Sequence, residues 1–248
     1  MDVSQLFWNA SLDELKQGYK QEGDYYTCLL CGETTENGII YQEDGVLYDA
    51  RKYMHMHITS THESVFHYLI GLDKKVTGLT EHQNNLLRLF YEGKSDADIQ
   101  ENTGIGSAST IRNHRFVLKE KERQAKVFLT MMELLKEKDT HAPTFIPVHK
   151  HATMVDDRYN ITEEERDKVL AKYFSDGMLK TFAMKEKYKI IVLREIVKRF
   201  DSEATYHEKE VNEIIKAVYN DYVTVRRYLI EYGFLDRNRD GSQYFLKK

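Results

Sequence analysis

The stretch with the most specific chemical requirement is YYTCLLCGE, residues 25–33, which contains the two cysteines of the chain. Two residues separate Cys28 from Cys31, and thiolates with this spacing on a tight turn can both bind one zinc ion. Gly32 follows and gives the backbone the freedom that such a turn needs. This spacing makes no disulfide framework and indicates metal or redox use in a reducing compartment.

Two histidines downstream complete the ligand count. His57 and His62 have four residues between them, which lies within the gap of finger-type zinc sites. His55 competes with His57, because the sequence HMH places both near the site, and His67 is a weaker candidate. A redox pair or two buried thiols is the alternative interpretation. We predict a structural zinc site with four protein ligands: Cys28, Cys31, His57 and His62.

The rest of residues 1–78 predicts a small module around this site. Residues 1–78 contain 6 basic and 12 acidic side chains, and this net charge of −6 disfavours contact with phosphates. Ser11 and Glu14 have capping-box spacing at the start of a short helix. Asp44-Gly45 predicts the turn of a hairpin, and a helix with a break near residues 60–63 follows it. We expect a scaffolding or protein-contact role for this module.

Residues 79–138 have the pattern of three helices. The predicted caps are Thr80, Ser95 and Ser107, and Gly93 and Gly104 end the first two helices. No stop signal follows Ser107 until Asp139, so the third helix is predicted to run for about 30 residues, longer than most globular helices.

The long third helix carries a short heptad-like seam. Its apolar members alternate at steps of four and three residues when the polar Lys121 is included. They are Leu118, Ala125, Phe128, Met132 and Leu135. This seam indicates a rigid arm or a homodimer contact.

The segment LTEHQNNLLRLFYEGKSDADIQENTGIGSASTIRNH, residues 79–114, resembles the LuxR-type helix-turn-helix. The likeness rests on Leu79-Thr80, on LLRLFYEGKSDADI, and on Thr110 to His114, where that family has TV-x-x-H. His82 and Gln83 depart from the family pattern. The resemblance implies that the helix beginning at Ser107 is the recognition helix.

The composition of that helix agrees with contact to nucleic acid. Residues 107–126 contain six basic and two acidic side chains, net +4. Arg and Lys bind phosphates, and Arg or Asn can pair with guanine or adenine edges in the major groove. A solvated basic face is the alternative. The candidate DNA contacts are Ser107, Ser109, Arg112, Asn113, Arg115 and Lys119.

Both prolines, Pro143 and Pro147, lie in residues 139–161, which have no clear period and are predicted to be a linker, either free or partly packed. Residues 162–248 then show helical patterns and a terminal hairpin around Asp240-Gly241, which together predict a winged helix. Residues 177–248 carry a net charge of +4. The candidate DNA contacts here are Thr224, Arg226, Arg227, Arg237 and Arg239.

Arg226 and Arg227 are adjacent and must point about 100° apart around a helix. We therefore expect one of them to pair internally, with Glu210 or Asp221, and the other to face outward.

Residues 164–248 also resemble a bacterial domain of unknown function found at the C-terminus of predicted transcriptional regulators. The stretches TFAMKEKYKIIVLREIVKRF, YHEKEVNEII and DYVTVRRYLIEYGFLDRNRDGSQYF carry the likeness. Ala183 and Asn220 stand where that group usually has proline and histidine. The CLLCGE and helix-turn-helix segments resemble the N-terminal parts of the same Firmicutes-type regulators.

The sequence therefore predicts a mainly α protein with a zinc-finger-like N-terminal module (1–78), a helix-turn-helix with a long helix (79–138), a linker (139–161) and a winged helix (162–248). We expect a cytoplasmic regulator that binds double-stranded DNA. The short apolar runs predict no membrane span, the start of the chain shows no secretory signal, and no motif indicates an enzyme.

Two other functions fit the same sequence. One is an adaptor or antagonist that binds a protein of the transcription machinery. The other is an RNA-binding protein that uses the aromatic side chains Tyr219, Tyr222 and Tyr228.

Overall fold

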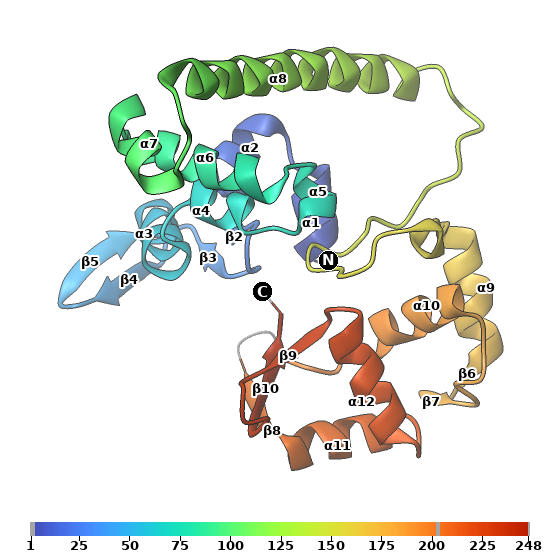
Figure 1. Cartoon of the computed structure of the whole chain (residues 1–248). Helices are drawn as coiled ribbons and strands as arrows, with labels where there is room; N and C mark the ends of the chain where they lie inside the picture. Colours follow the sequence, from blue (N-terminus) through green and yellow to red (C-terminus); the bar gives the residue numbers. More distant parts are fainter. Residues whose placement is uncertain (1–2, 202–203, 248) are drawn as a thin grey trace. The chain divides into compact units, whose positions relative to one another are not determined.

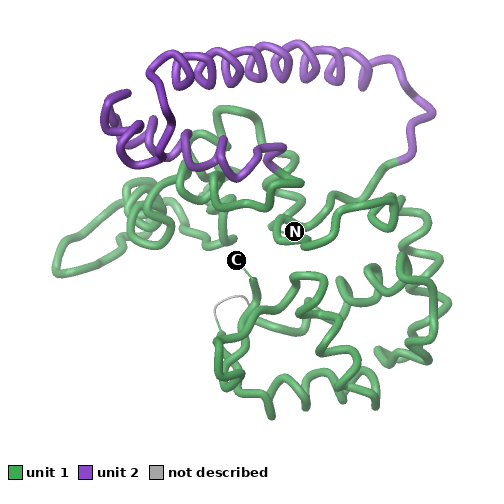
Figure 2. The backbone as a smooth tube through the Cα atoms, in the orientation of Figure 1, with its two compact units in different colours: residues 1–76, 144–248 green, residues 77–143 purple. Residues whose placement is uncertain are grey.

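The computed structural model describes residues 3–201 and 204–247, which are mainly helical with small antiparallel sheets (Figure 1). The chain forms two compact units (Figure 2): residues 1–76 with 144–248, and residues 77–143. The sequence predicts the N-terminal module and the C-terminal block as separate domains, whereas the structure places both in unit 1. Unit 2 is inserted between them in the sequence.

The N-terminal part of unit 1 builds the surroundings of the cysteine turn. Strands β1 (Tyr19–Glu22), β2 (Tyr25–Cys28) and β3 (Thr34–Glu36) form a sheet in that order, and β4 (Ile40–Glu43) pairs with β5 (Val46–Asp49). The helices are α1 (Val3–Asn9), α2 (Leu12–Gln17), α3 (Ala50–His62), α4 (Val65–Ile70) and α5 (Lys74–Thr77).

Local signals in this part are confirmed. The capping box of Ser11 and Glu14 begins α2. Asp44 and Gly45 both have positive φ, 50° and 78°, as a two-residue hairpin turn of this hand requires. The predicted helix break falls between α3 and α4, at Glu63. The strands β1 and β3 were not predicted, because their polar residues do not alternate with apolar ones.

The segment predicted to be a linker is packed over its larger part. Residues 144–161 pack into unit 1, and Ile146, Tyr159 and Ile161 are buried in its C-terminal core. The Ile146 amide donates to the Ile161 carbonyl (2.8 Å), which closes the segment into a loop. The 3-10 helix η1 (Asp157–Tyr159) is its only regular element among the described residues. The prolines and the lack of a period concealed these anchors.

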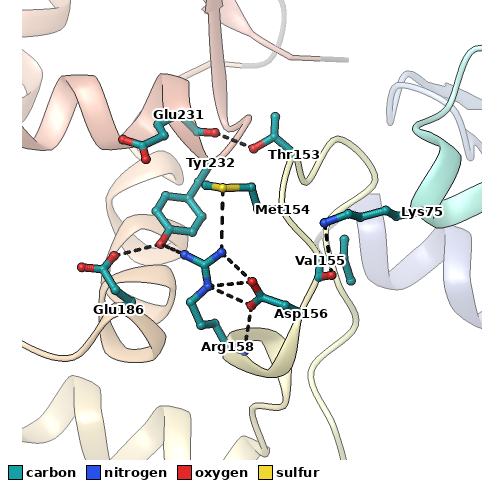
Figure 3. A network of polar contacts seen from close by, with 9 residues as sticks. All are labelled: Lys75, Thr153, Met154, Val155, Asp156, Arg158, Glu186, Glu231 and Tyr232. Atoms are coloured by element: carbon teal, nitrogen blue, oxygen red, sulfur yellow. Dashed lines mark hydrogen bonds and ion pairs between the residues drawn. The ribbon is translucent and has the colours of Figure 1, made fainter.

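A polar network fixes this segment on the C-terminal core (Figure 3). The Arg158 guanidinium pairs with Asp156 (2.6 Å) and donates to the Tyr232 hydroxyl (2.9 Å), which itself donates to Glu186 (2.9 Å). The hydrogen bonds from Arg158 lower the pKa of Asp156 to about 2, and burial raises the pKa of Tyr232 to about 12. At neutral pH the Asp156 carboxyl is therefore ionised, and the Tyr232 hydroxyl keeps its proton.

The C-terminal block begins with α9 (Glu163–Tyr173) and the short hairpin β6 (Phe174–Ser175) and β7 (Met178–Leu179). A helix, a strand, two helices and two strands follow: α10 (Glu186–Val197), β8 (Thr205–His207), α11 (Glu208–Lys216), α12 (Tyr222–Glu231), β9 (Leu235–Arg237) and β10 (Gln243–Leu246). The last three strands form an antiparallel sheet in the order β8-β10-β9. The predicted terminal hairpin is confirmed as β9 and β10.

Unit 2 consists of α6 (Glu81–Tyr91), α7 (Asp96–Thr103) and α8 (Ala108–Lys136). Each helix begins at its predicted cap, and α8 has 29 residues. The core of this unit is small, with one fully buried side chain from each helix: Leu86, Ile99 and Ile111. Within residues 3–201 and 204–247, no helix combines the length and the apolar character that crossing a bilayer needs.

We predict that Tyr232→Phe destabilises unit 1. Tyr232 is only 1% exposed, and its hydroxyl bridges Arg158 and Glu186. Loss of the hydroxyl removes one hydrogen bond from Arg158 and one from Glu186, which keep their ion pairs with Asp156 and Lys189. A hydrogen bond to a charged group typically contributes about 1.5–3 kcal/mol to the unfolding free energy. Denaturant unfolding measures the change. Tyr25→Phe, at an exposed tyrosine, is the matched control, and equal stability of the two variants would contradict the role of the network.

Candidate metal centre

The cysteine turn is held by its own backbone. β2 ends at Cys28, whose carbonyl accepts the Gly32 amide (2.9 Å), while the Cys28 amide donates to the Glu33 carbonyl (2.7 Å). Gly32 has φ +92°, and a Cβ there would lie 2.6 Å from the Val3 side chain. Only glycine therefore fits both the left-handed backbone and the close approach of α1.

The helix α3 brings the two histidines to this turn. The Nε2 atom of His57 lies 3.1 Å from the Cys31 sulfur, and the Nε2 atom of His62 lies 3.7 Å from the Cys28 sulfur. The four side-chain donor atoms all lie within 4.8 Å of one another, with the cysteines buried and the histidines half-buried. This group can hold one metal ion.

The structure separates the competing histidines from this group. His55 precedes His57 by two residues and therefore points about 200° away from it around α3. Its Nε2 atom lies 3.3 Å from the Tyr19 hydroxyl. His67, on α4, lies with its Nδ1 atom 2.9 Å from the Ser64 hydroxyl. Of the four histidines considered, the structure therefore brings His57 and His62 to the cysteines.

The two thiols differ in their protonation. The hydrogen bond from Cys31 lowers the pKa of Cys28 to about 7, helped by the backbone amides of Cys31 and Leu30. The same hydrogen bond raises the pKa of Cys31. Cys28 is thus partly a thiolate at neutral pH, and a thiolate is the form of cysteine that binds metals.

A buried lysine from the segment 144–161 contacts the same turn. The Lys150 ammonium donates to the carbonyls of Leu30 (2.6 Å) and Leu29 (3.3 Å), and it lies over the rings of Phe7 and Tyr68. Lys150 is only 5% exposed. No pattern in the sequence indicates this role, because the lysine stands in a stretch predicted to be a linker.

The candidate DNA contacts in unit 2 divide into two groups. Arg112 and Asn113 are exposed on α8, and Ser109 is exposed beside the Ser107 cap. Arg115 instead pairs with Asp96 (3.1 Å) and stacks on the Phe90 ring (3.7 Å to its centre), so it serves the packing of the unit. Lys119 is exposed and pairs with Glu122 one turn along the helix.

The C-terminal candidates divide in the same way. Arg226 pairs with Glu208 (2.7 Å) and its side chain is 16% exposed, while Arg227 is exposed. The prediction that one arginine pairs internally is confirmed, but its partner is Glu208. The two expected partners act as caps instead: Glu210 accepts the His207 amide and Asp221 accepts the Thr224 amide.

The remaining C-terminal candidates lie at the turn of the terminal hairpin and on α12. Arg237 and Arg239 are exposed, at the end of β9 and in the following loop. Thr224 is half-buried on α12.

Residues 178–246 match the model of a family described as uncharacterized proteins conserved in bacteria, DUF2087. The match runs from β7 to β10 and supports the resemblance of the C-terminal block to a bacterial domain of unknown function. Comparisons with curated proteins and with solved structures give no match.

We predict that the purified chain binds one equivalent of a divalent metal and that Cys31→Ser and His57→Ala remove it. Each change deletes one of the four donor atoms. His55→Ala is the matched control, because it changes the same helix outside the donor group. Elemental analysis of the dialysed proteins measures the metal. Retention by His57→Ala with loss by His55→Ala would show that the ligand is misassigned.

We also predict that Lys150→Met destabilises unit 1. The change leaves two buried carbonyl oxygens without their donor, which typically costs about 1–3 kcal/mol. Lys209→Met, at an exposed lysine, is the control. Denaturant unfolding of both metal-loaded variants gives the comparison, and an unchanged midpoint for Lys150→Met would refute the anchor.

Proposed function

We propose that this chain is a bacterial transcriptional regulator that binds double-stranded DNA through two helical modules and uses zinc only as a structural ion. The proposal combines three inferences: the nature of the metal, the type of each helical module and the ligand of the modules.

Zinc suits the donor group on α3 and the cysteine turn. Two thiolates and two imidazoles, Cys28, Cys31, His57 and His62, are the donor set of finger-type zinc sites. Both imidazoles turn their Nε2 atoms toward the sulfurs. The Thr61 hydroxyl lies 3.4 Å from Nδ1 of His57, a position from which a hydrogen-bond partner orients a metal-binding histidine. Four protein ligands leave no position for a substrate, so bound zinc would cross-link the β2–β3 turn to α3 and take part in no reaction.

The order and pairing of elements from α10 to β10 support a winged helix. Helix, strand, helix, helix and hairpin follow in sequence, and the first strand joins the hairpin at β10. In this architecture the last helix before the hairpin, α12, is the recognition helix, and the loop between β9 and β10 is the wing. Arg227 lies exposed on α12, and Arg239 lies in the wing.

The helices α6, α7 and α8 support the helix-turn-helix interpretation of unit 2. The observation that carries the functional proposal is the start of α8. Ile111 is buried against the other two helices, while Arg112 and Asn113 on the next positions are exposed. A recognition helix presents its N-terminal residues to base edges in this way, with its other face in the core.

RNA is less well supported, because two of the three tyrosines that would stack on bases, Tyr219 and Tyr228, are engaged within the protein. Tyr228 packs against Phe182 and stacks on Tyr232, and its hydroxyl accepts from Lys189. Tyr219 packs against Phe182 as well. Single-stranded RNA is bound on exposed aromatic platforms, which these two residues do not offer.

We predict that Arg112→Ala and Arg227→Ala each weaken binding to DNA selected from a random pool by the full-length, metal-loaded protein. Loss of a base contact costs about 1–3 kcal/mol and relaxes specificity at one position, whereas loss of a phosphate contact lowers the salt dependence. Titration of labelled duplexes at several salt concentrations distinguishes the two.

Lys52→Ala is the control, since this lysine is exposed on α3 in the acidic N-terminal module. Failure to select any duplex, or unchanged affinity in both arginine variants, would favour an adaptor that contacts the transcription machinery through protein surfaces.

A further inference from the structure

The C-terminal part of α8 presents an apolar surface to solvent. Every residue from 121 to 136 is exposed, and seven of the nine residues from 127 to 135 are apolar. Phe128 is 62% exposed and Leu135 is 49% exposed. At 100° per residue these side chains cover about 220° of the helix circumference, which is wider than the apolar stripe of an ordinary surface helix.

This surface continues the face by which α8 packs within unit 2. Ile111 is buried against Leu86 and Ile99, and the Nε2 atom of His114 lies 3.4 Å from that of His82 on α6. The seam then runs on at steps of four and three residues past the end of this small core. A groove of about 770 Å³ between α6 and α8 is lined by seam residues, among them Leu118, Ala125 and Phe128.

We propose that a second copy of this chain covers the seam by pairing its own α8 in the antiparallel direction. In heptad terms Ile111, Leu118, Ala125 and Met132 occupy position a, and His114, Lys121, Phe128 and Leu135 occupy position d. With the two-fold axis beside residue 130, Ala125 packs on Leu135 of the second copy and Phe128 packs on Met132. Leu129 and Met131 then flank the axis.

Charge complementarity favours a second copy of the chain as the partner, and antiparallel over parallel pairing of the two α8 helices. In the antiparallel register, Lys121 meets Asp139 of the second copy, just beyond the helix end, and Glu122 meets Lys136. Parallel pairing would instead place Lys121 against Lys121, with no pair of opposite charges at the flanking positions. A helix that is complementary in charge to itself in one direction favours self-association.

The existing ion pairs on α8 do not oppose this rearrangement. Glu122 pairs with Lys119 and Lys136 pairs with Glu133, each one turn apart and well exposed. Exposed pairs of this kind contribute little to stability. Giving them up for pairs between two copies therefore costs little free energy. The inference does not depend on DNA binding.

The first test reverses charges. We expect the full-length, metal-loaded protein to sediment as a dimer, and Glu122→Lys or Lys136→Glu to raise the dimer dissociation constant about tenfold or more, because each change creates two repulsive contacts. The double variant restores opposite charges and is expected to dimerise again. Lys126→Glu, at a position outside the seam, is the control. A monomeric parent protein, or single variants that dimerise like it, would overturn the proposal.

The second test determines whether the two α8 helices pair antiparallel or parallel, by thiol cross-linking of the metal-loaded chain. Leu129→Cys lies at the two-fold axis and is expected to cross-link between copies. Two Ala125→Cys residues would lie about 15 Å apart along the axis, since ten residues separate their levels, and a shorter bis-maleimide cannot join them. The parent chain, with buried Cys28 and Cys31, gives the background. Cross-linking of Ala125→Cys without Leu129→Cys would establish parallel pairing and refute the model.

Discussion

The buried ammonium of Lys150 holds unit 1 together as one body. It donates to the carbonyls of Leu29 and Leu30, in the middle of the cysteine turn. A buried charge is tolerated only with close partners, and here the partners come from a segment about 120 residues earlier in the chain. The cysteine turn and the segment that packs on the C-terminal core are therefore joined by one buried contact.

The sequence predicted what local rules decide. The grouping of the four candidate metal ligands follows from their spacing, and the caps Thr80, Ser95 and Ser107 follow from side-chain chemistry. The length of α8 follows from the lack of a stop signal. It did not predict the packing of residues 144–161, since Ile146 and Tyr159 find their partners at long range. The ion pairs of Arg115 and Arg226 with Asp96 and Glu208 are not predictable, because a basic residue in a helix has the same sequence pattern whether it faces solvent or an acid.

The two helical modules position their basic residues in the same way, through an ion pair between neighbouring helices. In each, one arginine is held by an acid from a neighbouring helix, while another in the same helix stays exposed. The held arginine fixes how the two helices pack and so sets the direction in which the exposed one points. Affinity for a polyanion would therefore depend on positioning by Asp96 and Glu208 as well as on the number of positive charges.

Unit 1 is discontinuous in the chain, and this affects how it can form. Trp8 donates to the carbonyl of Val148, 140 residues later, and these contacts close only after unit 2 has been made. During synthesis the first 76 residues have an apolar core of their own, but their contacts with Val148 and Lys150 have to wait. Contacts so distant slow folding because of the entropy of closing the loop. Early capture of a metal ion by the cysteine turn and α3 would protect the nascent segment during that delay.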